Sequence, residues 1–364
     1  MNNDVFSYLK LYDFQKEQES YNNNLFLDHQ RKLNLHHYKQ CIHYKKIIDN
    51  FFGFDSIENK KNSLKDMPYI PVDLFKNYDL FSMKKENFFK VLKSSGTTSS
   101  RYSKIYLDRE NANTQSISLS KIFSDFTGLN RPGMIIADSQ KTISDKKSFS
   151  ARAAGIIGFS YLCRKPTFAL NSEMNLILKN IEDILADNKF PKILLFGFTY
   201  IIWLYMLKDK LPNDIKLELC KKAVLVHGGG WKKLDDQNIS KEQFKDRVNE
   251  YLGIEKSLNY YGMVEQTGSI FMECEAGWLH SNPLCNVVSR DKRTLEESGI
   301  GRTGVAQVIS CLPTSYPGNS ILTDDLIVIK GVDNCKCGRK GVFFDILGRL
   351  KNSDPRGCSD TYKK

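Results

Sequence analysis

Short apolar segments alternate with amphipathic ones in the middle of the chain, and this alternation limits the possible folds more than any other feature. Segments of strand length lie at residues 134–137, 192–196 and 223–227. Apolar residues at helical spacing predict a helix over residues 174–185 and another around residues 200–207. Strands that alternate with helices form a mostly parallel sheet with helices on both faces. We therefore predict an α/β fold.

A further helix is marked by its N-terminal cap. Ser240 is followed three residues later by Gln243, which is the spacing of a capping box. Phe244, Val248 and Leu252 then recur on one face, so we expect a helix whose inner side they form.

Three parts are expected along the chain. Residues 1–65 are polar and aromatic and are predicted to be a helical segment packed on the core. Residues 66–345 would form the α/β domain, with a β-rich end that includes strands at 304–310 and 326–330. Residues 346–364 would be a hinge and a C-terminal tail.

The net charge and the cysteines indicate which partners and which cellular compartment to expect. The formal net charge of +11 favours anionic partners, but no basic stripe with interleaved aromatic residues indicates nucleic acid. Residues 1–10 lack the apolar stretch of an export signal, and the longest apolar run, residues 193–207, is shorter than the roughly 20 residues of a membrane helix. Nine cysteines without an export signal indicate a reducing compartment. We expect a cytoplasmic protein with no membrane span and no nucleic-acid partner.

Several histidines and cysteines are expected to have no chemical role. His36, His37 and His43 lie close together in sequence, but nothing near them completes a metal set, so surface positions are predicted. Five cysteines in more apolar settings are expected to be buried packing residues: Cys41, Cys163, Cys220, Cys285 and Cys311.

A loop rich in hydroxyl groups is the sharpest local signal. Its residues are Ser94, Ser95, Gly96, Thr97, Thr98, Ser99 and Ser100. Hydroxyls and free backbone N–H groups around one glycine can surround a polyphosphate. The spacing and the lysine of a P-loop are absent. The alternative is a serine-rich surface turn.

Three glycines follow a predicted strand. Gly228, Gly229 and Gly230 come directly after residues 223–227 and before Trp231. Glycines let the backbone approach a ligand closely, and ligands of open parallel sheets bind where strands end. The alternative is a tight turn with a packed tryptophan, but three consecutive glycines exceed what a turn requires, so we favour a binding site.

Three shorter motifs carry aromatic, acidic and basic side chains. The ring of Tyr261 can stack on a base, and the carboxylate of Glu265 can hold Mg²⁺. Asp324 and Asp325 can accept hydrogen bonds from ribose hydroxyls, unless they form a solvated turn. Arg349, directly after a glycine, can reach a phosphate or a ribose.

Taken in order, these five motifs resemble those of adenylate-forming enzymes. From about residue 35 onward the chain resembles acyl-protein synthetases of the LuxE type and, more distantly, phenylacetate–CoA ligases. The resemblance includes residues 70–76, 313–317 and 356–359. It implies the N-terminal domain fold of adenylate-forming enzymes, in which helices cover mixed sheets beside a small β-rich subdomain. The C-terminal lid domain would be absent or vestigial.

The resemblance also implies a site for ATP and Mg²⁺. Its cofactor-binding residues would be Ser94, Ser95, Gly96, Thr97, Thr98, Gly228, Gly229, Gly230, Tyr261, Gly262, Glu265, Asp325 and Arg349. Glu265 would bind Mg²⁺ and, with Arg349, act in catalysis. Lid domains carry a catalytic lysine, and the candidates for its role here are Lys351, Lys104 and a partner subunit.

Cys358 is the candidate acyl acceptor, because LuxE-type enzymes carry an acylated cysteine near the C-terminus. Gly357 gives the tail freedom, and Arg356, Lys363 and Lys364 favour the thiolate. A tethered nucleophile also meets the activated acid at high effective concentration. The alternative is an unreactive tail cysteine.

A cysteine–histidine set predicts a structural zinc site. Cys335 and Cys337 form a C-x-C turn, and Cys274 and His280 lie upstream. Three thiolates and an imidazole complete a tetrahedral zinc site. Some relatives of phenylacetate–CoA ligases carry such a set, whereas the luminescence enzymes do not. The alternative is four unrelated core or surface residues.

We therefore expect a ligase that activates a carboxylic acid, by resemblance a fatty acid, as acyl-AMP. The acyl group would pass to Cys358 as a thioester and then to a partner, by resemblance an acyl reductase. One alternative is a ligase that loads coenzyme A, a carrier protein or an amine. Another is a non-catalytic nucleotide-binding subunit, against which Glu265, Asp325 and Arg349 argue.

Overall fold

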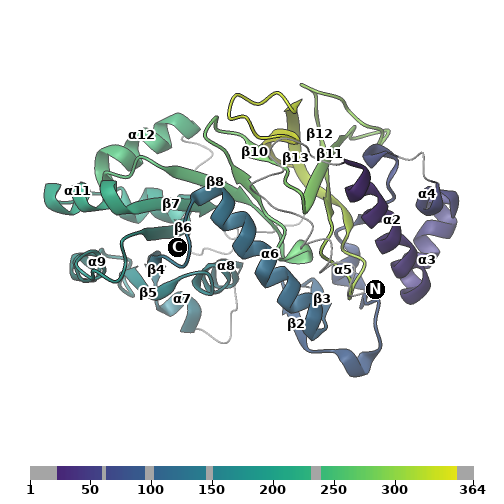
Figure 1. Ribbon diagram of the computed structural model, residues 1–364, viewed down its shortest axis with the longest axis horizontal. Coiled ribbons are helices and arrows are strands. Elements are labelled where there is room, and N and C mark those ends of the chain that lie inside the picture. The colour runs from purple at the N-terminus through teal and green to yellow at the C-terminus, as the bar shows by residue number, and fades with distance from the viewer. Residues whose placement is uncertain (1–22, 60–62, 95–101, 145–150, 231–238, 351–364) are drawn as a thin grey trace. The chain divides into compact units, whose positions relative to one another are not determined.

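The protein is represented by a computed structural model that describes residues 23–59, 63–94, 102–144, 151–230 and 239–350 (Figure 1). It divides into two compact units. Among the described residues, the first unit comprises those within 23–94, 102–125 and 261–350, and the second comprises those within 126–260. The division of the sequence at residues 65 and 345 stays a prediction.

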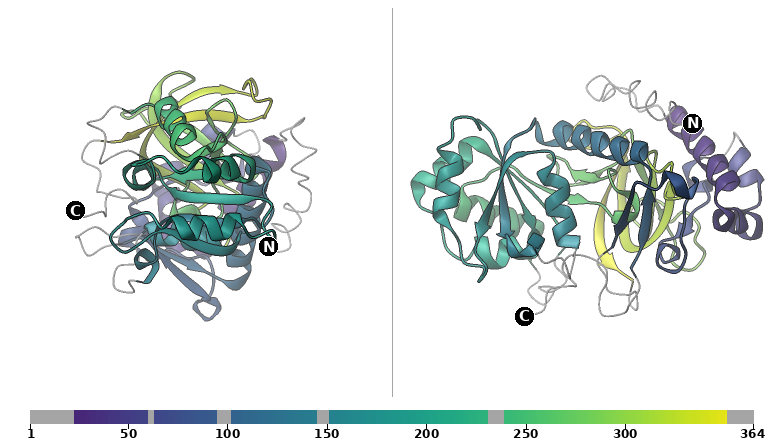
Figure 2. Two further views of the ribbon diagram at one scale, coloured as in Figure 1. Left: turned by 90° about the vertical axis from the view of Figure 1, so that its left-hand side faces the viewer. Right: turned by 90° about the horizontal axis from the view of Figure 1, so that it is seen from below.

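The second unit is built on parallel strands in the order β8-β7-β6-β4-β5. Helices lie on both sides of these strands (Figure 2). The strands are β4 (Gly133–Ser139), β5 (Arg164–Leu170), β6 (Ile193–Phe198), β7 (Ala223–Gly228) and β8 (Ser257–Tyr261). Every residue of β4, β6 and β7 is buried, as expected for strands covered on both faces. The predicted strands and their parallel arrangement are confirmed.

The helices described in the second unit include three that were predicted, near residues 174–185, near 200–207 and after Ser240, and others that were not. They are α7 (Lys141–Ser144), α8 (Ala151–Ser160), α9 (Leu178–Leu185), α10 (Thr199–Ile201), η4 (Ile202–Met206), α11 (Asn213–Lys222) and α12 (Lys241–Leu252). The capping box of α12 is confirmed, because the Ser240 side chain accepts from the Gln243 backbone N–H. Phe244, Val248 and Leu252 form its buried face.

One predicted helix begins later than expected. The first residues of the segment 174–185 are not helical, and α9 starts at Leu178. Met174 has a φ of 64°, and the Asn171 side chain accepts hydrogen bonds from two backbone N–H groups of this turn. The Ile177 N–H donates to the Ala169 carbonyl of β5. Pairing with the strand therefore overrides the helical spacing of the apolar residues.

The first unit contains a largely antiparallel sheet in the order β11-β12-β13-β14-β10-β9, and β1 pairs with β13 in parallel. Its strands are β1 (Ile70–Pro71), β9 (Phe271–Glu273), β10 (Leu279–His280), β11 (Cys285–Arg290), β12 (Thr303–Ser310), β13 (Ser320–Val332) and β14 (Val342–Arg349). A separate hairpin joins β2 (Lys90–Lys93) to β3 (Lys104–Leu107). The expected β-rich end is confirmed.

Helices surround this sheet and its core. They are α2 (Asn23–Gln40), α3 (Ile42–Ile47), η1 (Ile48–Phe52), α4 (Asp55–Glu58), η2 (Leu64–Asp66), α5 (Leu74–Asn77), η3 (Lys85–Asn87), α6 (Arg109–Thr127, ending in the second unit) and η6 (Val264–Gln266). Tyr44, Phe75 and Phe344 are among the large buried side chains. Within the described residues, no helix is long and apolar enough to cross a membrane.

Candidate nucleotide site and cysteine cluster

A tyrosine, an aspartate and an arginine meet in the first unit. Asp325 and Arg349 face each other in the register of β13 and β14. The Tyr261 hydroxyl donates to Asp325 Oδ2 over 2.6 Å, and Arg349 Nε donates to Asp325 Oδ1 over 2.9 Å. The sequence placed all three at one nucleotide, and the structure brings them into contact. Each carboxylate oxygen keeps a further lone pair that could accept a ribose hydroxyl.

Tyr261 is held in its protonated form. Burial, together with the neighbouring negative charge of Asp325, raises the pKa of the Tyr261 hydroxyl well above its usual value. The ring also lies 6.1 Å from that of Phe271, measured between centroids. The phenol is therefore a fixed hydrogen-bond donor that orients the Asp325 carboxylate.

Glu265 is a buried carboxylate in the short helix η6. The residue is 4% exposed, and burial raises the pKa of its carboxyl group. The Ser103 side chain and the charges of Arg349 and Lys76 oppose this shift. The Tyr316 hydroxyl donates to the Glu265 carbonyl over 3.0 Å and so fixes the backbone. Glu265 thus offers a costly buried charge that a cation would stabilise.

The hydroxyl-rich loop begins at the end of the β2–β3 hairpin. The Ser94 N–H donates to the Ser103 carbonyl over 3.0 Å, and the Ser103 N–H donates to Ser94 Oγ over 2.8 Å. Ser95, Gly96, Thr97 and Thr98 lie outside the described residues. Because the Ser103 side chain acts on Glu265, the root of this loop and Glu265 lie in one region.

Lys104 is the first residue of β3, and its side chain is paired with another carboxylate. Its ammonium group lies 3.0 Å from Asp79 Oδ1, which also accepts from the Tyr106 hydroxyl over 2.8 Å. This geometry does not favour Lys104 for the role of a lid lysine. Lys351, the other candidate, lies outside the described residues.

The glycine motif of the second unit follows β7. An added Cβ at Gly228 would lie 2.6 Å from the ring of Tyr260, so only glycine fits there. Gly229 and Gly230 have φ angles of 87° and 60°, which glycine adopts most readily. Trp231 lies outside the described residues.

His227 precedes these glycines and is neutral. Its Nδ1 lies 2.8 Å from the Thr199 hydroxyl, and its ring packs against Phe244. Burial, with the charges of Lys245 and Lys241, lowers the pKa of His227 to about 3. Its Nε2 is buried without a hydrogen-bond partner in the part of the chain that the structure describes.

We expect His227 to make the protein less stable in mild acid. Its folded pKa of about 3 lies below the roughly 6.5 of an unfolded histidine, so the unfolded state takes up a proton first as the pH falls. From about pH 7.5 to about pH 5.5 this costs about 1.4 kcal/mol of unfolding free energy. Urea unfolding followed by tryptophan fluorescence should show that His227→Gln loses less stability over this range by that amount. An equal loss in both proteins would contradict the expectation.

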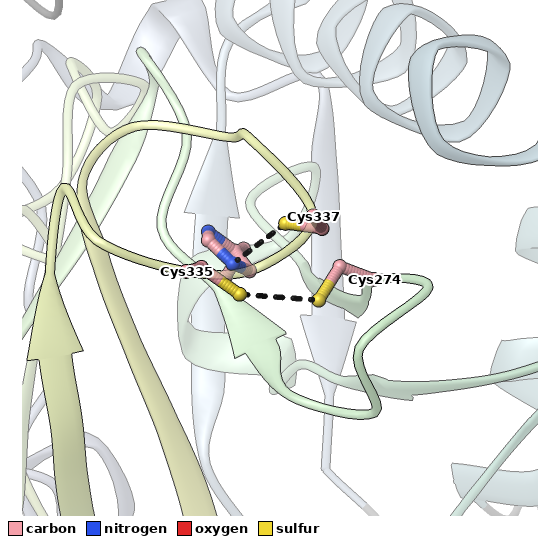
Figure 3. A group of neighbouring side chains, drawn as sticks. Cys274, Cys335 and Cys337 are labelled. Carbon is pink, nitrogen blue, oxygen red and sulfur yellow. Dashed lines mark hydrogen bonds between the residues drawn. The ribbon is translucent and has the colours of Figure 1, made fainter.

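Three cysteines and a histidine form a compact cluster in the first unit (Figure 3). The ligand atoms of Cys274, His280, Cys335 and Cys337 all lie within 4.8 Å of one another. Cys274 Sγ lies 3.9 Å from Cys335 Sγ, and Cys337 Sγ lies 3.4 Å from His280 Nε2. The four residues that the sequence grouped are therefore brought together by the turns before β10 and β14.

The protonation states of this cluster follow from its burial. Burial lowers the pKa of His280 to about 4, and the nearby charge of Arg339 adds to this effect. Burial raises the pKa of the Cys337 thiol to about 12. Arg339 holds the second turn through Asp125, with Nη1 2.5 Å from Oδ2. A neutral imidazole and three thiols that release protons on metal binding are the donor set of a zinc site.

Some predicted residues cannot be placed, and others were missed. Cys358 lies outside the described residues. Tyr316, which donates to the Glu265 carbonyl, and Ser103, whose side chain lowers the pKa of Glu265, were not predicted as site residues. Ser103 continues the hydroxyl-rich run after a two-residue gap, so its signal was present in the sequence. Tyr316 lies in the stretch 313–317 that carries part of the resemblance, but nothing local indicates its partner, which lies 51 residues away.

The fold defines the class of this protein. A crystal structure of 2-hydroxyisobutyryl-CoA ligase in the postadenylation state with 2-HIB-AMP superimposes with a TM-score of 0.66. The two sequences are 14% identical, and the match covers 90% of this chain and 68% of that one. An open conformation of the same ligase with 2-HIB-AMP and CoA gives a TM-score of 0.66 at 15% identity, over 91% and 75% of the chains. The fold is that of adenylate-forming ligases.

The sequence comparisons identify the family. The chain belongs to the LuxE acyl-protein synthetase family, whose family model matches residues 2–364. A long-chain-fatty-acid–luciferin-component ligase of Aliivibrio fischeri is 22% identical over 336 residues, which cover 89% of this chain and 84% of the relative. The Vibrio harveyi ligase of the same name is 22% identical over 344 residues, or 89% and 83% of the two chains. The resemblance found in the motifs is confirmed.

Proposed function

We propose that this protein is an ATP-dependent ligase that activates a fatty acid as acyl-AMP and transfers the acyl group to its own Cys358. Membership of the acyl-protein synthetase family supports this reaction. The names of both relatives indicate a long-chain fatty acid as the substrate. An acyl reductase is the proposed final recipient, and the cytoplasm is the proposed location.

One observation carries the assignment of the site. Tyr261, Asp325 and Arg349 form one hydrogen-bonded set, and the charge of Arg349 also acts on the Glu265 carboxylate. Motifs far apart in sequence thus converge within the first unit. Asp325 would bind the ribose of ATP, Tyr261 and Gly262 would contact the adenine, and Arg349 would contact ribose or phosphate.

The phosphates and the acid would be bound by backbone and hydroxyl groups. By the resemblance, residues 94–98 would surround the phosphates, and Gly228, Gly229 and Gly230 would bind ligand where β7 ends. Mg²⁺, held by Glu265, would neutralise charge on the phosphates when bound. The protein would then act chiefly by positioning and electrostatic stabilisation.

Two balanced steps complete the proposed reaction. A carboxylate oxygen of the acid bonds to the α-phosphorus of ATP, and pyrophosphate leaves. The thiolate of Cys358 then attacks the acyl carbon, and AMP leaves with the electrons of the broken C–O bond. The product is an S-acyl enzyme.

Pyrophosphate exchange into ATP tests the first step. The purified protein should catalyse exchange only when an acid is added, with long-chain fatty acids better than short or aromatic acids. The absence of exchange across this panel would instead favour a nucleotide-binding subunit without catalysis.

We also propose that Cys274, His280, Cys335 and Cys337 bind one structural zinc ion. Ligand sulfurs of a tetrahedral zinc site with bonds of about 2.3 Å lie about 3.8 Å apart. The 3.9 Å between Cys274 and Cys335 matches this spacing without metal. Zinc would join the turn between β9 and β10 to the turn between β13 and β14, close to the strand that ends at Arg349.

We expect Cys335→Ser to lose zinc and stability. Metal analysis should find about one zinc per wild-type chain and less than about 0.2 in the variant, whose thermal midpoint should fall by about 5 °C or more. Cys220→Ser, which changes an exposed cysteine of the second unit, should keep both values. Wild-type protein that holds no zinc after expression with added zinc would refute the site.

A further inference from the structure

The inward face of α2 is unusually polar. Six of its residues at helical spacing are buried: Phe26, His29, Gln30, Leu33, Asn34 and His37. Four of these six carry polar side chains, whereas an inward helix face is ordinarily apolar. Such groups are costly to bury unless each finds a partner, so their partners indicate what the helix does.

Among these side chains, Asn34 bonds to Tyr44, Met67 and Asn319. The other three donate to carbonyl groups of one buried segment, residues 310–315. Each of its six carbonyls accepts a hydrogen bond from outside the segment. The donors, in order from Ser310 to Ser315, are Gln30 Nε2 (2.8 Å), His29 Nε2 (3.0 Å), Asn111 Nδ2 (2.6 Å), His37 Nε2 (3.2 Å), His36 Nε2 (2.9 Å) and the Ser82 N–H (2.7 Å). Four of the six donors therefore belong to α2.

The three histidines act as hydrogen-bond donors. A carbonyl only accepts, so Nε2 of His29, His36 and His37 carries the hydrogen. In His37 the other ring nitrogen lies 2.8 Å from the Ser82 hydroxyl. Burial lowers the pKa of His36 and His37, in agreement with neutral rings. We call His29, Gln30, His36 and His37 the α2 latch.

The latched segment leads directly to the turn that carries Glu265. The Tyr316 hydroxyl donates to the Glu265 carbonyl over 3.0 Å, and Gln266 Nε2 donates to the Gly318 carbonyl over 2.8 Å. An added Cβ at Gly318 would lie 2.8 Å from the Glu265 carbonyl oxygen. The residues that directly follow the segment, Tyr316 and Gly318, therefore pack closely on the backbone of Glu265, so that a shift of the segment is passed to that backbone.

We propose that the α2 latch positions Glu265 for Mg²⁺, so that its four residues are positioning residues of the nucleotide site. The inference rests on the proposed role of Glu265. Because every carbonyl of residues 310–315 accepts a hydrogen bond from outside the segment, the backbone of the segment is held in one conformation. A displacement of a catalytic group by about 1 Å can cost up to about 100-fold in rate.

The test compares matched substitutions in or near α2. Gln30→Leu removes a latch donor, and Gln40→Leu makes the same change at an exposed position of the same helix. His36 is half-buried, so His36→Phe should fold even if Gln30→Leu does not. Its control is His43→Phe, which makes the same change outside the α2 latch. The His43 ring packs against Tyr78, with centroids 4.9 Å apart.

Two readouts separate positioning from stability. The first is the free Mg²⁺ concentration that half-saturates acid-dependent pyrophosphate exchange, which should rise about 3- to 10-fold in the latch variants while the KM for the acid stays within about twofold. The second is deuterium uptake at residues 262–268, which should be faster in the latch variants. The controls should match wild type in both.

Each outcome decides the proposal. A folded His36→Phe protein with wild-type Mg²⁺ dependence would overturn it, even if its melting temperature falls. Wild-type protein without acid-dependent exchange would contradict the proposed function instead. Deuterium uptake at residues 262–268 would then be the remaining test of the α2 latch. Uptake in the latch variants equal to that in the controls would overturn the proposal.

Discussion

Replacement of Glu265 by glutamine should lower acid-dependent pyrophosphate exchange by about 100-fold or more. The change removes the negative charge that we propose binds Mg²⁺ and preserves the shape of the side chain. The Glu265 backbone carbonyl, which accepts from Tyr316, is unaffected. Exchange measured over a range of free Mg²⁺ should show that the loss is largest at low Mg²⁺.

The same variant should be as stable as wild type or more stable. Burial raises the pKa of the Glu265 carboxyl, which means that its ionised form is disfavoured in the folded protein. Glutamine carries no charge to bury, so the thermal midpoint of the variant should equal or exceed that of wild type. A residue whose removal abolishes activity without loss of stability is retained for function.

Glu296→Gln provides the matched control, because Glu296 is exposed on the surface of the first unit. It should keep wild-type exchange at every Mg²⁺ concentration. Full exchange by Glu265→Gln at wild-type Mg²⁺ would remove Glu265 from the site. A fall in both exchange and thermal midpoint would indicate a structural role instead.

The sequence was most informative where structure depends on neighbours in the chain. The buried strands β4, β6 and β7 and the cap of α12 follow from local apolar runs and from the spacing of Ser240 and Gln243. The contact between Asp325 and Arg349 follows from strand register, which their sequence motifs alone did not show.

Three predictions were wrong, and a distant partner explains the first of them. His37 was expected at the surface but is fully buried, because it donates to a carbonyl 276 residues away in sequence. Cys220 was expected to be buried, yet it is exposed near Glu255, with 3.8 Å between Sγ and Oε1. The helix expected from residue 174 loses its first turn to β5. Local composition cannot report a contact as distant as that of His37.

Replacement of Cys358 by serine should abolish the acyl-enzyme but leave the first half-reaction intact. With radioactive fatty acid and ATP, wild-type protein should carry label that neutral hydroxylamine releases, as expected for a thioester. In Cys358→Ser this transfer should fall by about 10⁴-fold or more, because the nucleophile is gone. Pyrophosphate exchange should continue near the wild-type rate, since it reports only acyl-AMP formation.

The described cysteines are poor alternatives to Cys358. Burial raises the pKa of the thiols of Cys41 and Cys285, and that of Cys163 to about 12, so few thiolates form there. Cys274, Cys335 and Cys337 are committed to the cluster. Within the described residues, Cys220 is the exposed cysteine that remains.

Cys220→Ser is therefore the decisive control and should keep full, hydroxylamine-sensitive label. Loss of label in that variant, with label retained in Cys358→Ser, would make Cys220 the acceptor. If wild-type protein and both variants catalyse exchange but carry no label, the acceptor thiol lies on another molecule. Release of AMP on addition of coenzyme A or a carrier protein would then identify a ligase that loads an external acceptor. Its adenylation site would be the same.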